Sequence, residues 1–302
     1  WFAITALMHT VIVLEKRNIL YEWAIILCLL TFILSVTGTF LVRSGILNSV
    51  HTFASDPSRG LFILVFLSLM IFTSLTIYFK KRNKEFYNFN TNSKEIFILA
   101  NNWFMAFFLA TVLIGTLYPI FLDVLTGAKV SVGPPFYNIV IIPLVIPVLF
   151  LMTLGPQFGW INSKTEKLYK TLYILVGAVI INLFLFYFFK NYGIYSNLIL
   201  ISAIFLILHS FLDAKNSITN KKKFQFPRII SHLGFGMLVF FIGINNQYSI
   251  ETDFNLKVGE TKKLNNYELV FENIKIEENK NYKSIIGDFT FFATGAQVEH
   301  DC

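Results

Sequence analysis

Histidine is scarce in this chain, and its placement marks the first candidates for chemistry. Five histidines occur among 302 residues, and two of them, His9 and His232, lie inside apolar runs a few residues from a basic cluster. With a rise of 1.5 Å per helical residue, both would lie roughly 6 to 10 Å inside the same edge of a membrane. Two imidazoles at matching depth on two helices could ligate one heme iron from opposite faces. The pair is therefore a candidate bis-histidine site.

Each of these histidines also has a plainer interpretation, as a packing residue that is hydrogen-bonded to a neighbouring helix. His209 lies four residues before Asp213 at a similar depth, so depth alone does not choose among the three histidines. Gly234 and Gly236 follow His232 and leave room for a flat macrocycle or, equally well, for another helix. The residues by themselves leave both interpretations open.

A different kind of segment holds His51, the polar stretch RSGILNSVHTFASDPSRG at 43–60. Arg43 and Arg59 stand near its two ends, and Asp56 followed by proline favours a defined turn. Arginine binds carboxylates through two parallel hydrogen bonds, so the stretch is a candidate site for anions such as heme propionates. The alternative is an ordinary capped loop whose arginines reach lipid phosphates.

Membrane spans must position these residues. The chain is 55% hydrophobic and only 14% charged, which is typical of a membrane protein. A helix needs about 20 apolar residues to cross the hydrocarbon core, and we identify eight such runs, the first of them cut short. The runs lie at about 1–14, 22–43, 61–79, 98–122, 137–155, 171–189, 196–212 and 229–245.

The basic residues indicate the orientation of these spans. They concentrate after the first, third, fifth and seventh runs, so the positive-inside rule makes those loops cytoplasmic and leaves the C-terminal segment outside. Topology therefore explains the net charge of +7 better than nucleic-acid binding does. The four clusters are Lys16 and Arg17; Lys80, Lys81, Arg82, Lys84 and Lys94; Lys164, Lys167 and Lys170; and Lys215, Lys221, Lys222, Lys223 and Arg228.

From about residue 246 the sequence becomes polar and alternating. Alternation at 267–271, 274–276 and 288–292 and a turn at 258–260 predict strands. The last ten residues, 293–302, fit neither a strand nor a span. We predict an all-α polytopic membrane domain over 1–245 and a small β-rich extracytoplasmic domain over 246–302.

Several function classes find no support. The chain has no Walker A, HExxH or GxSxG motif, no paired acidic residues in a span, and no CxxC among its two cysteines. Two alternatives remain beside heme handling: a membrane transporter or exporter of heme or another anion, and a structural scaffold. No internal repeat or pair of broken helices is evident, which disfavours a transporter.

Three long stretches closely resemble the CcmF family, a heme-handling component of cytochrome c maturation. They lie at 30–64, 115–138 and 231–260, and with the intervening spans the resemblance covers nearly the whole chain. It implies a heme lyase subunit of the bacterial inner membrane, with its C-terminal domain in the periplasm. Such a subunit receives heme from the chaperone CcmE and promotes two thioether bonds to the CxxCH of apocytochrome c, in a complex with CcmH and CcmI.

The resemblance also implies roles for single residues. His9 in LMHTVIVLEKR and His232 in SHLGFG match the family's two axial ligands of a stable b-type heme in the membrane, whereas His209 matches no ligand. His51 in SVHTFASDP matches one of two external histidines that hold the incoming, transient heme, and is the expected catalytic residue. Arg43 and Arg59 remain candidates for binding that heme, and quinol is a candidate electron donor.

Some expected parts are not in this sequence. The family's tryptophan-rich WWD segment and the second external histidine would precede Trp1, and a last membrane span would follow the β-rich domain. Trp1 lies inside an apolar run, so we expect the natural chain to begin further upstream. We expect this chain to retain the membrane heme pair and half of the external site.

Overall fold

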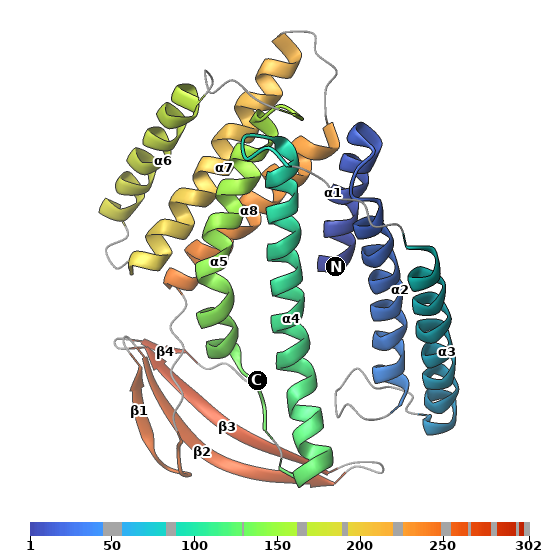
Figure 1. Ribbon diagram of the computed structural model, residues 1–302. Coiled ribbons are helices and arrows are strands. Elements are labelled where there is room, and N and C mark those ends of the chain that lie inside the picture. The colour runs from blue at the N-terminus through green and yellow to red at the C-terminus, as the bar shows by residue number, and fades with distance from the viewer. Residues whose placement is uncertain are drawn as a thin grey trace. The chain divides into compact units, whose positions relative to one another are not determined.

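The computed structural model resolves the chain into two compact units, Trp1–Tyr248 and Ser249–Cys302 (Figure 1). The first unit is helical and the second holds a β-sheet. The structure describes residues 1–44, 56–82, 89–128, 130–161, 168–188, 193–219, 226–248, 255–264, 267–278, 283–293 and 296–298.

Eight α-helices form the described part of the first unit. Seven of them are long and apolar enough to cross a membrane, and the remaining helix, α1, has 16 residues. The prediction of a polytopic α-helical membrane protein is confirmed. The helices are α1 (Phe2–Arg17), α2 (Tyr21–Arg43), α3 (Pro57–Lys81), α4 (Lys94–Thr126), α5 (Pro134–Leu154), the short 3-10 helix η1 (Gly155–Gln157), α6 (Leu168–Phe188), α7 (Ile194–Thr219) and α8 (Phe226–Tyr248).

Two helices extend well beyond the apolar runs that predicted them, because polar side chains at their ends have partners. α7 continues past residue 212 to Thr219, and Asp213 in this extension pairs with Arg228 of α8. α4 begins at Lys94 rather than at 98, and Glu95 in its first turn pairs with Arg17 of α1. The apolar run predicts only the apolar part of each helix, whereas the helical hydrogen bonds continue through the polar residues beyond it.

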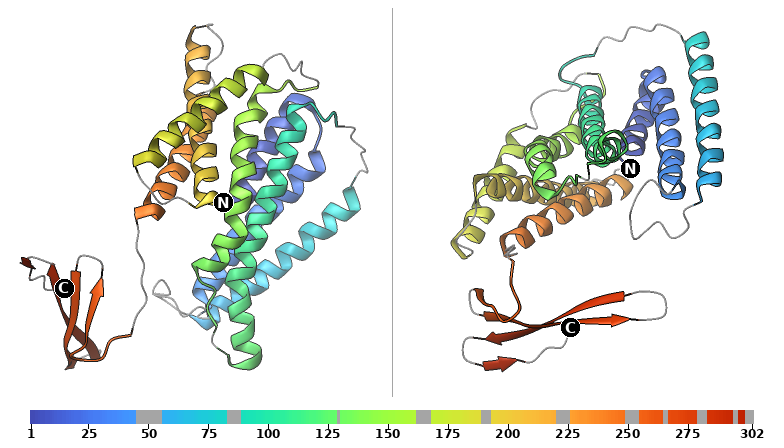
Figure 2. Two further views of the ribbon diagram at one scale, coloured as in Figure 1. Left: turned by 90° about the vertical axis from the view of Figure 1, so that its left-hand side faces the viewer. Right: turned by 90° about the horizontal axis from the view of Figure 1, so that it is seen from below.

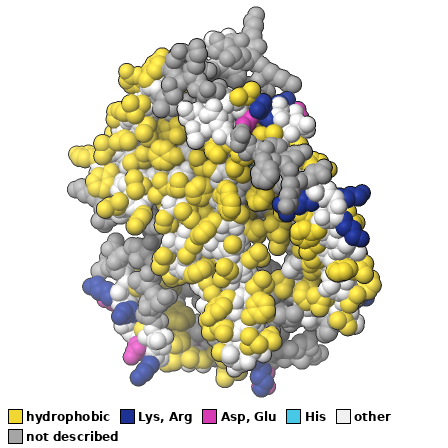
Figure 3. All heavy atoms as spheres, in the orientation of Figure 1, with side chains coloured by type: hydrophobic (Ala, Val, Ile, Leu, Met, Phe, Trp, Pro, Cys, Tyr) yellow, Lys and Arg dark blue, Asp and Glu magenta, His cyan; other side chains and the backbone are white. Residues whose placement is uncertain are grey.

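The packing order of the helices centres on α4 and α7. α4 packs against α1 and α5, and α1 packs in turn on α2, which carries α3 (Figure 1). α5 also packs on α7, which contacts both α6 and α8 (Figure 2). Much of the visible helical surface is hydrophobic, as expected for helices that face lipid (Figure 3).

The second unit holds a four-stranded antiparallel sheet in the order β1-β2-β3-β4, as a meander. The predicted segments 267–271 and 274–276 belong to one strand, β2, with a register shift between Phe271 and Asn273. The expectation that 293–302 contains no strand was wrong, because β4 pairs there with the edge of β3. The strands are β1 (Thr261–Leu264), β2 (Tyr267–Glu278), β3 (Lys283–Ala293) and β4 (Ala296–Val298).

Candidate functional site

A cavity of about 330 Å³, lined by both His9 and His232, lies where α1, α4, α5 and α8 meet. Its volume lies within the range of roughly 300 to 1,000 Å³ that is usual for ligand pockets. We call it the two-histidine cavity. Its lining residues are His9, Ile12, Lys16, Lys94, Phe97, Ile98, Asn101, Leu151, Met152, Gly155, Pro156, Trp160, Arg228 and His232.

α1 positions His9 through its amphipathic pattern. One stripe of the helix is buried, and His9, Ile12 and Lys16 form a separate stripe that lines the cavity. The buried stripe is held by a polar contact in which Asn102 of α4, fully buried, lies 2.6 Å from the Thr10 hydroxyl. The same amide, with its oxygen toward α1, also accepts from the indole of Trp23 on α2 at 3.1 Å. Three helices are thereby tied together next to the site.

The imidazole of His9 has one nitrogen engaged. Its Nδ1 lies 2.9 Å from the carbonyl oxygen of Thr5, one turn earlier in α1. An Nδ1–H that donates to this carbonyl leaves Nε2 with a free lone pair. Metal-binding histidines commonly have this arrangement, because the second hydrogen bond orients the ring and raises its basicity.

α8 positions His232 in a similar way. The imidazole lies near the backbone of Met152 on α5 and near His9, and it interacts electrostatically with both. One turn later, a Cβ at Gly236 would lie 3.1 Å from Ile207, so this glycine serves the packing of α8 on α7. A Cβ at Gly234 would meet nothing within 4 Å. For Gly236 the structure therefore favours the helix-packing interpretation.

Three cations also line the cavity, and the sequence analysis did not connect them with the site. Lys16, Lys94 and Arg228 come from α1, α4 and α8. The Lys94 ammonium lies 5.2 Å from the ring centre of Trp160. Arg228 and Lys16 could have been found from local spacing, since Arg228 lies four residues before His232 and Lys16 lies seven residues after His9 on the same helix face. Lys94 could not, because it lies on another helix.

His209 lies in an adjoining pocket. This small pocket is lined by His209, Asp213 and Arg228 and also by His232, but His209 is not among the residues that line the two-histidine cavity. Asp213 Oδ2 and Arg228 Nη2 are 2.5 Å apart at the rim of that pocket. Of the three membrane histidines, the cavity therefore brings His9 and His232 together.

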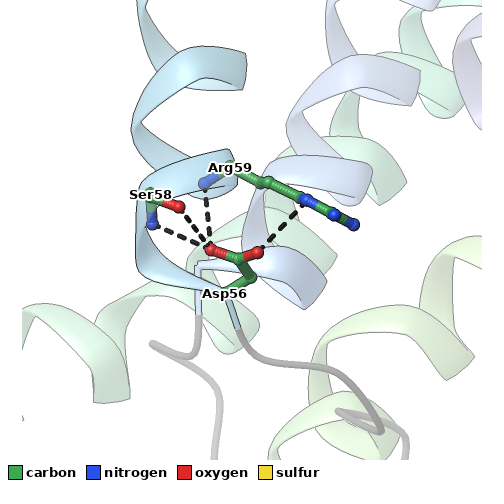
Figure 4. Close-up of polar contacts among 3 residues, drawn as sticks. All are labelled: Asp56, Ser58 and Arg59. Carbon is green, nitrogen blue, oxygen red and sulfur yellow. Dashed lines mark hydrogen bonds and ion pairs between the residues drawn. The ribbon is translucent and has the colours of Figure 1, made fainter.

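The second predicted site is described only at its edges, because His51 lies outside the described residues. The backbone N–H of Asp56 donates to the carbonyl of Arg43 at 3.0 Å, so the end of α2 and the start of α3 are joined. Asp56 caps α3 by accepting from Ser58 Oγ at 2.6 Å and from the N–H of Arg59 at 3.2 Å (Figure 4).

The same carboxylate of Asp56 pairs with the guanidinium of Arg59 at 3.2 Å. The hydrogen bond from the Ser58 hydroxyl and that from the Arg59 N–H together lower the pKa of Asp56 below its ordinary value. Arg59 is thus part of a helix cap, while its side chain stays 70% exposed.

No family model matches the chain, whereas individual proteins do. It is 32% identical over 310 residues to the cytochrome c-type biogenesis protein CcmF of Pseudomonas aeruginosa, covering 99% of this chain and 47% of that protein. It is 32% identical over 290 residues to CcmF of Escherichia coli, covering 94% of this chain and 45% of that protein. The solved structure of a cytochrome c heme lyase CcmF has the same fold, with a TM-score of 0.66 at 19% identity over 98% of this chain and 46% of its own length. The chain spans about half the length of the curated relatives it matches.

Proposed function

Because the chain belongs to the CcmF family of cytochrome c-type biogenesis proteins, we propose that it forms the membrane part of a heme lyase and holds a b-type heme in the two-histidine cavity. The observation that carries this proposal is the pair of imidazoles in one cavity. His9 and His232 come from helices that are more than 200 residues apart in sequence. The Nδ1 of His9 is hydrogen-bonded to the carbonyl of Thr5, which leaves its Nε2 available to a metal, and the imidazole of His232 interacts electrostatically with His9.

The residues around the cavity have distinct roles in this proposal. His9 and His232 would hold the heme iron, and the carbonyl of Thr5 orients the ring of His9. When bound, a bis-histidine heme supplies one-electron transfer. We propose quinol as the electron donor and the external heme as the acceptor. Asn102 holds α1 at the distance from α4 that the cavity requires.

For the full-length protein we propose the activity of the family. It receives heme from the chaperone CcmE and promotes thioether formation at the CxxCH of apocytochrome c, together with CcmH and CcmI, in the bacterial inner membrane. His51 is the proposed ligand of this incoming heme, and Arg43 and Arg59 are proposed partners of its propionates. Arg59 uses its Nε for Asp56, and the other N–H groups of its exposed guanidinium would bind the propionate.

Absorption spectroscopy of the purified full-length protein tests the proposal. We expect wild-type protein to carry a low-spin bis-histidine heme, and His9→Ala and His232→Ala each to lose that spectrum, because one axial ligand is removed. His209→Ala is the matched control, since His209 is not among the residues that line the two-histidine cavity, and it should retain the spectrum. His51→Ala should also retain it but should block cytochrome c assembly.

The outcomes separate the alternatives. A normal bis-histidine spectrum in both His9→Ala and His232→Ala would reject the ligand assignment. Wild-type protein without tightly bound heme would favour a transporter or a scaffold. Unimpaired cytochrome c assembly in His51→Ala would count against the external role of His51.

A further inference from the structure

We propose that Lys94 and Arg228 bind the carboxylates of the ligand in the two-histidine cavity and thereby determine which edge of the ligand faces the basic end of the site. This inference rests on the proposed function for the identity of the ligand, since a heme carries two propionate groups. A heme has an apolar ring and a charged edge, and the wall of the cavity likewise has an apolar part and a charged part. Its wall includes Phe97, Ile98 and Leu151 as well as the two cations.

The charge of the cavity wall is unbalanced. Lys16, Lys94 and Arg228 line it, and none of its described lining residues is acidic. Lys94 and Arg228 lie on different helices, α4 and α8, yet interact electrostatically with one another, and Asp213, the partner of Arg228, also attracts Lys94. Asp213 does not line the cavity, so an anion inside the cavity would add a second favourable contact for both cations.

The nearby carboxylates are already engaged elsewhere. Glu95, next to Lys94 in sequence, is buried and pairs with Arg17 of α1. Among the described residues, Lys94 has no carboxylate within ion-pair distance. Its ammonium group lies over the ring of Trp160. Arg228 uses one nitrogen for Asp213, but a guanidinium has five N–H donors, so capacity for a second carboxylate remains.

An independent observation indicates that the cavity takes a ligand with hydrogen-bond acceptors. The side-chain amide nitrogen of Asn101 is buried and has no hydrogen-bond partner among the described residues, and Asn101 is only 9% exposed. It lines the same cavity as Lys94, two turns further along α4. A buried donor without an acceptor is unfavourable, and the acceptor must come from whatever fills the cavity.

Titration of the heme-free full-length protein with heme and with heme dimethyl ester tests the inference. The ester keeps the iron and the ring but has no carboxylate charge. We expect both to give a low-spin bis-histidine spectrum, with heme bound more tightly by on the order of tenfold for each charge-assisted contact. Lys94→Gln should reduce this preference by about the same factor without weakening ester binding.

Two further variants sharpen the test. Arg228→Gln should also reduce the preference, although it leaves Asp213 without its partner, so Lys94→Gln is the cleaner variant. Lys80→Gln is the matched control, because Lys80 lies in the last turn of α3 and does not line the cavity. It should leave the preference for heme over the ester unchanged.

The outcomes distinguish this inference from the proposed function. Equal affinity of wild-type protein for heme and ester would overturn the inference while leaving bis-histidine binding intact, and is the result expected if a lipid phosphate occupies the cations. An unchanged preference in Lys94→Gln would overturn it as well. If neither compound gives a low-spin spectrum with wild-type protein, both the proposed function and the inference are rejected.

Discussion

At the scale of single residues, the contacts of Asp56 determine where α3 begins. Its carboxylate accepts from the N–H groups of Ser58 and Arg59, both at 3.2 Å, and α3 begins with these residues. An aspartate at this position satisfies backbone donors that a helix otherwise leaves without partners. The ion pair with Arg59 adds to the same cap. The segment that contains His51 therefore ends at a defined position at the start of α3.

Replacing Asp56 tests this cap. Asp56→Ala removes the acceptor, so the amides of Ser58 and Arg59 should exchange with deuterium faster than in wild type. Asp56→Asn keeps an acceptor and should retain protection. The pKa of Asp56 is lowered in the folded protein, so its stabilising effect is present above the ordinary carboxyl pKa and is lost as the pH falls through the lowered value. Hydrogen exchange that is equal in all three proteins would contradict the assigned cap.

At the scale of elements, the contact of α7 with α8 controls the position of His232. Gly236 and Gly243 of α8 both face side chains of α7, where a Cβ would come within 3.1 Å of Ile207 and 3.0 Å of Leu200. Small residues allow two membrane helices to approach closely. Because Gly236 is one turn after His232 on the same face, a shift of α8 at this contact moves the imidazole.

We therefore expect Gly236→Val to lower the free energy of unfolding by about 1–3 kcal/mol if the helices cannot adjust. The variant should also bind less heme. Gly234→Val is the matched control, since a Cβ there would meet nothing within 4 Å, and it should affect stability less. Thermal unfolding in detergent and heme content per protein provide the two measurements. Equal losses in the two variants would argue against a specific role of the contact with α7.

At the scale of the whole molecule, alternating charge along the chain predicts a single orientation in the membrane. The last turn of α3 carries Lys80 and Lys81, and five helices long enough to cross a membrane, α4 to α8, separate it in sequence from the sheet unit. We propose that these two regions lie on opposite sides of the membrane, with the basic helix ends in the cytoplasm.

Labelling with a membrane-impermeant thiol reagent checks this orientation. In protein in which Cys28 and Cys302 are replaced by serine, Lys262→Cys on β1 should react in intact cells with a permeable outer membrane. Lys80→Cys should react only after the inner membrane is opened. Both positions are exposed in the structure, so burial does not account for a difference. Labelling of both from the same side would contradict the proposed topology.

The sequence by itself determined the helical membrane architecture and the β-rich C-terminal region, because both follow from local periodicity of apolar residues. It also identified His9 and His232 as candidates from their depth, and resemblance to a known family selected them over His209. The depth argument works within one helix, since each residue advances by a constant rise. It says nothing about which faces of two helices meet.

Only the tertiary structure decided which side chains share one cavity. Lys94, Asn101 and Trp160 line the cavity beside His9 and His232 because α4 packs on α1 and α5, while α7 packs on both α5 and α8. Contacts between different helices, whose residues here are about 60 or more positions apart, depend on that packing and leave no local pattern in the sequence. The short strand β4 was missed for a related reason, because it is defined by pairing with the edge of β3 rather than by its own alternation.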